Sequence, residues 1–223
     1  MRTQNENDWV AALEQEARGL VRVLDENPAA RRLFEGRIDS EGYAHYLAQT
    51  YHYVRWTTPL LEGAGLRMRR LGLHPALAEL LLSKSDEEHG HERWLLADLK
   101  NLGWSAERVE ATECCAAVKA YVGWNQYTTR AGVPTAFLGT AYVLESLSVQ
   151  RAGATVERLI AAERIPNIRK AVTFLRGHGD VDGDHVEQLA EVLRALEDPE
   201  EQAALILSAR TTRVLYPGFF RER

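Results

Sequence analysis

Apolar positions recur at intervals of three and four residues along most of the chain, which is the period of helices packed against a core. Capping residues, prolines and glycines divide this pattern into segments. No period-two alternation is long enough to predict a strand, and neither an internal repeat nor a long linker is present. Helices are expected over residues 8–24, 28–36, 40–72, 75–102, 105–127, 134–151 and 167–196, and from 198 onward. The sequence therefore predicts one all-α domain over residues 1–223, a helical bundle of seven to nine helices.

Particular residues define several of these boundaries. Asn27, Ser40, Ser105 and Asp198 are expected N-caps, because their short polar side chains accept hydrogen bonds from the first free N–H groups of a helix. Pro59 lies inside the segment 40–72 and predicts a kink there, because proline cannot continue the helical hydrogen bonds.

Composition restricts the classes of partner. The chain has 223 residues, of which 45% are hydrophobic and 26% charged, with a net charge of −5, so no basic surface for nucleic acid or anionic membrane is predicted. The polar, acidic start does not resemble a signal peptide, and no apolar run approaches the roughly 18 residues that span a bilayer. Cys114 and Cys115 are adjacent and cannot build a disulfide framework. We expect a cytoplasmic protein without nucleic-acid or membrane partners, for which a homodimer is one compatible assembly.

The segment 177–185 has the most unusual composition, with two of the seven histidines, three aspartates and three glycines. Read as one helix, it places His178, Asp182 and His185 at i, i+4 and i+7, within about 60° of one another. Two imidazoles and a carboxylate on one face form half of a metal site. Each glycine costs a helix up to about 1 kcal/mol, and the aspartates repel each other without a cation. We therefore expect metal to order this helix.

Two other helices offer matching ligands. Glu88 and His91 stand at i and i+3 of the segment 75–102, a spacing by which one helix supplies a carboxylate and an imidazole, whereas His89 points roughly 160° away from His91. Glu145 is the only charge in an otherwise apolar stretch, 136–149. A lone buried carboxylate costs several kcal/mol unless it is paired or metal-bound. An arginine partner or a protonated acid is the ordinary alternative, but the two other motifs favour a metal.

Together these motifs offer three carboxylates and three imidazoles from three helices. A mixed set of nitrogen and oxygen ligands suits iron or manganese, and six ligands exceed the need of one tetrahedral zinc. Two metals bridged by a carboxylate would use the whole set and leave positions open for dioxygen and substrate. The six candidate ligands are Glu88, His91, Glu145, His178, Asp182 and His185.

The order of these motifs, from the third expected helix to the seventh, resembles the haem-oxygenase-like di-iron oxidases, a family related in fold to thiaminase-like and pyrroloquinoline-quinone-synthesis proteins. The resemblance implies two ferrous ions held by the six candidates without haem, dioxygen as co-substrate and an external electron donor. Glu88, Glu145 and Asp182 would be catalytic. The substrate would be a small amine, amino acid or fatty acid that undergoes N-oxygenation, decarboxylation or C–C cleavage. Residues around Tyr142, Ser146 and Phe174 are expected to line its pocket.

The chain departs from the resembled pattern at Leu81, where several members carry an additional carboxylate seven residues before the glutamate. One iron is accordingly expected to be held less tightly.

Three alternatives stay open at this point. Residues 180–191 partly imitate a calcium loop, although His185 occupies the position where such a loop needs glycine. A haem oxygenase would need an axial histidine, for which His45 and His52 are candidates. A scaffold or cofactor carrier would use the same acids and histidines in salt bridges. Iron content and haem absorbance distinguish these alternatives from the di-iron oxidase.

Overall fold

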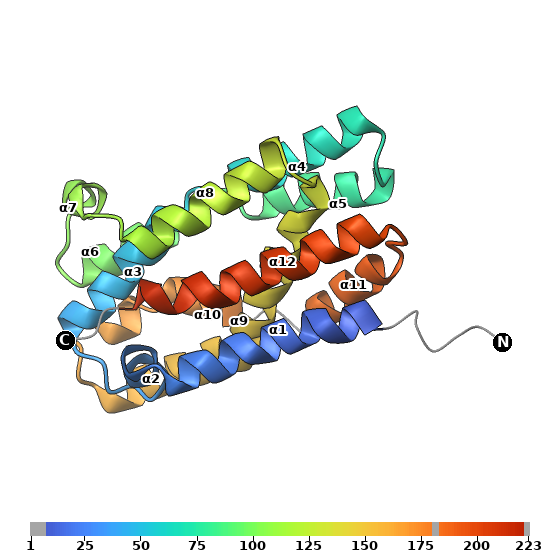
Figure 1. The fold of residues 1–223 in the computed structure, drawn as a ribbon. Coiled ribbons are helices and arrows are strands. Elements are labelled where there is room, and N and C mark those ends of the chain that lie inside the picture. Colours follow the sequence, from blue (N-terminus) through green and yellow to red (C-terminus); the bar gives the residue numbers. More distant parts are fainter. Residues whose placement is uncertain (1–7, 180–182, 221–223) are drawn as a thin grey trace.

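The computed structural model describes residues 8–179 and 183–220, and all regular secondary structure within these ranges is helical (Figure 1). The expected all-α fold class is confirmed. The helices are, in chain order, α1 (Asp8–Glu26), α2 (Pro28–Phe34), α3 (Ser40–Val54), α4 (Thr57–Leu71), α5 (Pro75–Glu87), α6 (His91–Asn101), α7 (Ala106–Ala111), α8 (Ala116–Arg130), the 3₁₀ turn η1 (Pro134–Ala136), α9 (Phe137–Ala162), η2 (Ile168–Lys170), α10 (Thr173–Gly179), α11 (Gly183–Arg194), α12 (Pro199–Leu215) and η3 (Tyr216–Phe219).

Several N-terminal boundaries follow from the capping residues. Asn27 accepts hydrogen bonds from the backbone N–H groups of α2, Ser105 does so for α7 and Asp198 for α12. The expected cap at Ser40 is wrong by one residue. Asp39 is the N-cap of α3 and accepts from the N–H of Gly42 at 2.7 Å, because a carboxylate there reaches the free N–H groups that Ser40, already helical, does not.

The segment 40–72 forms two helices rather than one kinked helix. The first ends at Val54 and α4 begins at Thr57, so Pro59 lies in the first turn of α4 and not at a kink. Proline is tolerated there because the N–H groups of a first turn have no partner within the helix.

The segment 75–102, which was expected to form one helix, likewise forms two. Helix α5 ends at Glu87 and α6 begins at His91, with Gly90 in the left-handed region at φ 91° between them. Glu88 and His91 therefore lie on two sides of a turn, where glycine adopts a positive φ without steric cost.

Other helix boundaries also differ from the expected ones. The segment 105–127 is divided into α7 and α8, and α9 continues to Ala162 instead of ending near residue 151. The helix expected from Asn167 begins at Thr173, because Asn167 itself has a positive φ of 60° and precedes a short 3₁₀ turn.

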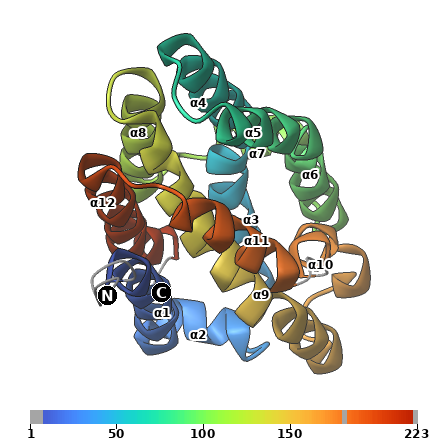
Figure 2. The same cartoon turned by 90° about the vertical axis from the view of Figure 1, so that its right-hand side faces the viewer.

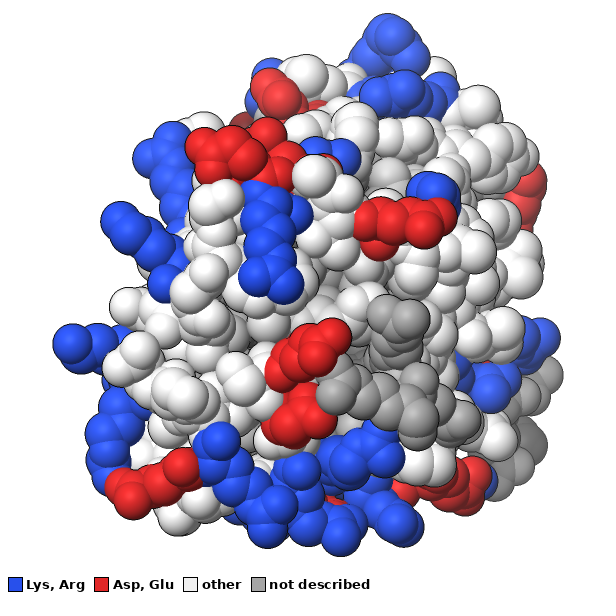
Figure 3. Space-filling model, turned by 90° about the vertical axis from the view of Figure 1, so that its left-hand side faces the viewer, with Lys and Arg blue, Asp and Glu red and all other residues white. Residues whose placement is uncertain are grey.

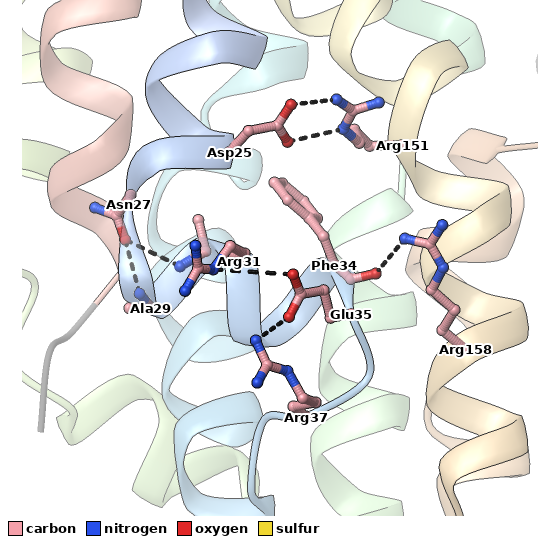
Figure 4. Close-up of polar contacts among 10 residues, drawn as sticks. Asp25, Asn27, Ala29, Arg31, Phe34, Glu35, Arg37, Arg151 and Arg158 are labelled. Atoms are coloured by element: carbon pink, nitrogen blue, oxygen red, sulfur yellow. Dashed lines mark hydrogen bonds and ion pairs between the residues drawn. The ribbon is translucent and has the colours of Figure 1, made fainter.

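Helix α9 is the central element. It contacts α1, α10 and α12, while α4 packs against α5 and α3 against α6 (Figures 1 and 2). The approach of α9 to α12 is close, because a Cβ on Gly139 would collide with the carbonyl of Leu205. Polar contacts also tie α9 to the first two helices (Figure 4): Arg151 pairs with Asp25, and Arg158 donates to the carbonyl of Phe34 at 2.9 Å.

The surface carries charges of both signs. On the face shown in Figure 3, groups of acidic side chains lie beside groups of basic ones. In the ranges that the structure describes, no helix has both the length and the apolar character needed to cross a membrane.

Candidate metal centre

Glu88, His91 and His178 come together although 87 positions separate the last two along the chain. One ligand atom from each side chain lies within 4.8 Å of the others. His91 Nδ1 is 2.9 Å from Glu88 Oε2, and His178 Nε2 is 4.0 Å from the same oxygen. The α5–α6 turn supplies the first two residues and α10 supplies the third. The structure thus joins parts of two motifs that the sequence offered separately.

The spacing of these atoms fits a shared cation. His91 Nδ1 is buried and has no hydrogen-bond partner of suitable geometry, although Glu88 Oε2 lies 2.9 Å away. Ligand atoms about 2.1 Å from one metal ion are about 3.0 Å apart when adjacent at right angles and about 4.2 Å apart when opposite. The observed separations of 2.9 Å and 4.0 Å are close to these two values. The three residues therefore fit one ion.

The tautomer and the charge state of His178 also suit a metal ligand. Its Nδ1 is 3.0 Å from the carbonyl of Phe174, which can only accept, so Nδ1 carries the proton and Nε2 keeps its lone pair toward Glu88. Burial is the main cause that lowers the pKa of His178, so the neutral ring is favoured. Burial alone would raise the pKa of Glu88, but the neighbouring His91 and His178 lower it overall, which keeps the carboxylate ionised.

Trp94 supports the cluster from α6. Its ring stacks on the imidazole of His91 with centroids 4.0 Å apart and an angle of 23°. The same indole packs against α10, because a Cβ on Gly177 would lie 2.6 Å from its ring. A Cβ on Gly179 would lie 2.8 Å from the backbone nitrogen of Gly153 in α9. These two glycines thus have a packing role that the composition of the segment did not reveal.

Residues 44–216 match the model of a family described as iron-containing redox enzymes. The chain belongs to this family. An iron-binding family agrees with the mixed carboxylate and imidazole ligands of the cluster. No curated protein matches the chain significantly.

Two solved structures show the same fold. A domain of unknown function with a haem-oxygenase-like fold from Shewanella denitrificans OS217 has 20% sequence identity and a TM-score of 0.80, covering 94% of this chain and 89% of that one. A TenA homologue from Pseudomonas syringae pv. tomato DC3000 has 15% identity and a TM-score of 0.78, covering 95% of this chain and 90% of the other. This member of the iron-containing redox enzyme family therefore has the haem-oxygenase-like fold that the motifs predicted.

Of the other three predicted ligands, the structure describes the side chain of Glu145 but not those of Asp182 and His185. Glu145 lies half-buried on α9 and lines the same cavity as Glu88 and His178, although it is outside the group of ligand atoms within 4.8 Å. Asp182 lies outside the described residues. His185 belongs to α11, but its side chain is likewise outside the described part of the chain. Their role as metal ligands stays a prediction.

The cavity beside the cluster has a volume of about 470 Å³, and most of its wall is aliphatic or aromatic. Phe174 lines it as expected. Neighbours of Tyr142 and Ser146 also line it, among them Ala141, Leu144 and Ser148, whereas Tyr142 and Ser146 themselves are not among the described residues of the wall. Burial and then the charge of Glu14 in α1 raise the pKa of Tyr142, and the Ser146 hydroxyl donates to the Tyr142 carbonyl. Leu81 lies in the wall, 1% exposed, at the position of the absent carboxylate.

Asp98 lies near the site, although no sequence motif indicated it. It is fully buried on α6 and accepts hydrogen bonds from the backbone of α10. The available signal was its position between Leu95 and Leu99, two apolar residues that are also fully buried. A carboxylate on the apolar face of a helix requires a partner.

Proposed function

We propose that the chain is a non-haem di-iron oxidase that uses dioxygen and external electrons to oxidise a small organic molecule. The observation that carries the proposal is the group of Glu88, His91 and His178 at the wall of a largely apolar cavity. These residues would hold one ferrous ion, and Glu145, Asp182 and His185 would complete the site for a second. Iron in such a site supplies the activation of dioxygen, and manganese is the alternative metal.

The shape of the cavity favours an elongated apolar substrate. Its lining residues on α9 extend from Phe137 to Thr155, and a helix rises about 1.5 Å per residue, so the part of α9 that borders the cavity is about 27 Å long. Lys84 and Arg151 also line it, Lys84 paired with Glu87 and Arg151 with Asp25, so a substrate carboxylate would share these cations with their present partners. Among the substrate classes that the family resemblance implies, we therefore favour a fatty acid, with amines and amino acids as the other outcomes.

Metal loading tests the site. Protein reconstituted anaerobically with ferrous iron is expected to retain about two irons per chain. E88Q, H91A and H178A are expected to retain less, because each removes one ligand. H89A is the matched control, since His89 is exposed and adjacent to Glu88 in sequence but outside the cluster. Wild-type protein that binds no iron, or equal loading of all four variants, would refute the proposed site.

Rapid mixing tests the reaction. Reduced, iron-loaded protein mixed with dioxygen is expected to show a transient change in absorbance that a suitable substrate accelerates. A series of fatty acids, amines and amino acids then identifies the class that increases oxygen consumption. No change with any substrate would contradict the proposed oxidase.

The principal alternative is a haem oxygenase. Neither His45 nor His52, the expected axial ligands, is among the described residues that line the cavity. His52 is buried and its Nε2 lies 2.9 Å from the carbonyl of Thr112, so this nitrogen is already engaged. Haem titration is expected to give no saturable Soret band, and a stoichiometric band would favour the alternative. A scaffold or carrier of the same fold would bind neither haem nor iron.

A further inference from the structure

We infer that Asp98 is a positioning residue for the metal site, because it fixes α10 against α6 so that His178 faces Glu88 and His91. The inference rests on the proposed metal site.

The carboxylate of Asp98 binds the start of α10 with both oxygens. Oδ1 accepts the backbone N–H of Thr173 at 3.0 Å, and Oδ2 accepts that of Phe174 at 2.9 Å. These are the first two residues of α10, whose N–H groups have no partner within the helix. Asp98 is 0% exposed. A side chain of α6 therefore accepts the hydrogen bonds of the first two N–H groups of α10.

Helix α6 also carries a ligand of the cluster. His91 and Asp98 are seven residues apart, so two helical turns separate them and they share one face. At one end of this face the rings of His91 and His178 are 5.2 Å apart, and at the other Asp98 binds Phe174. Trp94 lies between them in the sequence of α6 and packs near Gly177. The two helices are therefore held together at both ends of their contact.

The connection from Asp98 to His178 passes through one residue. The N–H of Phe174 donates to Asp98, and the carbonyl of Phe174 accepts from His178 Nδ1. A shift of Phe174 would therefore also shift the group that orients the His178 ring. Helix α10 has only seven residues, and helices of this length are not stable alone. Its position consequently depends on such external contacts.

The decisive experiment measures cobalt(II) affinity of the full-length chain by competition with a chelator. D98N keeps the shape of the side chain but replaces one acceptor oxygen by an NH₂ group, and we expect its affinity to be about 10-fold lower. D198N is the matched control, because Asp198 caps α12 by the same type of hydrogen bond. Its affinity is expected to equal that of the wild type. Equal affinity of D98N and wild type would overturn the inference.

A double-mutant cycle tests whether Asp98 acts through His178. In the H178A background, D98N is expected to have little further effect on cobalt(II) affinity, because the ligand that it positions is already absent. A 10-fold loss that persists in this background would overturn the inference. The d–d absorption of cobalt(II) provides a second readout, and D98N is expected to change it whereas D198N is not.

Hydrogen exchange separates this inference from the proposed function. In metal-free protein, D98N is expected to accelerate exchange in residues 173–179 and to leave α12 unchanged. Unchanged exchange in α10 would overturn the positioning role even if the wild type binds metal. Absence of metal binding in the wild type would instead refute the proposed function. If D98N does not fold, D98S, which offers at most one acceptor and places no NH₂ group against the N–H groups of α10, is expected to show the same changes.

Discussion

Substitution of Gly179 by alanine distinguishes two explanations for the glycines near His178. If these glycines serve only to weaken the helix, alanine should stabilise the protein by up to about 1 kcal/mol. If they allow close packing, alanine should destabilise it. A Cβ at position 179 would lie 2.8 Å from the backbone nitrogen of Gly153 and 3.2 Å from the Cβ of Ala152. Both neighbours belong to α9, so either α9 or α10 must move.

The magnitude follows from two opposing contributions. Overpacking of a tight contact costs about 1–3 kcal/mol. The gain in helix propensity is below its full value of about 1 kcal/mol, because Gly179 is the last residue of α10. We therefore expect the free energy of unfolding of G179A to fall by about 1–2 kcal/mol. For a chain of this size, such a loss lowers Tm by about 2–8 °C.

Thermal and urea unfolding of metal-free protein measure this difference, and G123A is the control. Gly123 lies inside α8, and a Cβ there would have no neighbour within 4 Å, so G123A is expected to raise Tm by up to about 4 °C. If G179A were as stable as the wild type, or more stable, the packing argument would be incorrect. The expectation that metal orders residues 177–190 is a separate prediction, which hydrogen exchange with and without ferrous iron tests.

Three other predictions concern the turn, the cavity and pH. Gly90 and Gly72 both have a positive φ, so G90A and G72A should each lower the free energy of unfolding by about 1–2 kcal/mol. Only G90A distorts the turn beside the cluster, so only G90A should also weaken cobalt(II) binding in a chelator competition. A141F adds bulk to the cavity wall, so the chain-length profile of oxygen consumption should shift to shorter acids at unchanged iron content; an unchanged profile would contradict the proposed substrate position. Burial lowers the pKa of His52, so its stabilising contribution is complete above its unfolded pKa of about 6.5 and is lost as pH falls through the lower folded value. Urea titrations should therefore show a loss of stability below about pH 6.5 that is smaller in H52Q.

The fold was predictable where the signal is local. Asn27, Ser105 and Asp198 cap the helices that follow them, since capping requires only a short polar side chain and the next few N–H groups. Breaks inside long apolar patterns were not predictable in the same way. Around residues 55–56 no glycine interrupts the pattern, and the break there allows α4 to pack against α5 while α3 packs against α6. Such a break is set by tertiary packing rather than by local propensity.

The candidate site was predictable because histidines and acids at helical spacing are uncommon in a helix that has only a structural role. Histidines and acids at helical spacing identified Glu88, His91 and His178, which the structure brings together. Asp98 could not be recognised by this criterion, because it belongs to no ligand motif, and its position between Leu95 and Leu99 indicates that it needs a partner without indicating which one. Its hydrogen bonds join α6 to a segment about 75 residues later in the chain, and that pairing exists only in the folded protein.

Glu88 and His91 were identified from a continuous helix that does not exist, and the reason is geometric. Residues three apart are close in a helix, and they are also close across a four-residue turn, where the first and last Cα atoms lie within about 7 Å. The N–H of His91 donates to the carbonyl of Glu88 at 3.2 Å, which is the hydrogen bond of such a turn. The i, i+3 spacing therefore predicted the proximity of the two side chains correctly, whereas their orientation depends on Gly90. In this chain the three candidate ligands lie at or near the ends of helices, next to turns and caps such as Gly90 and Asp98.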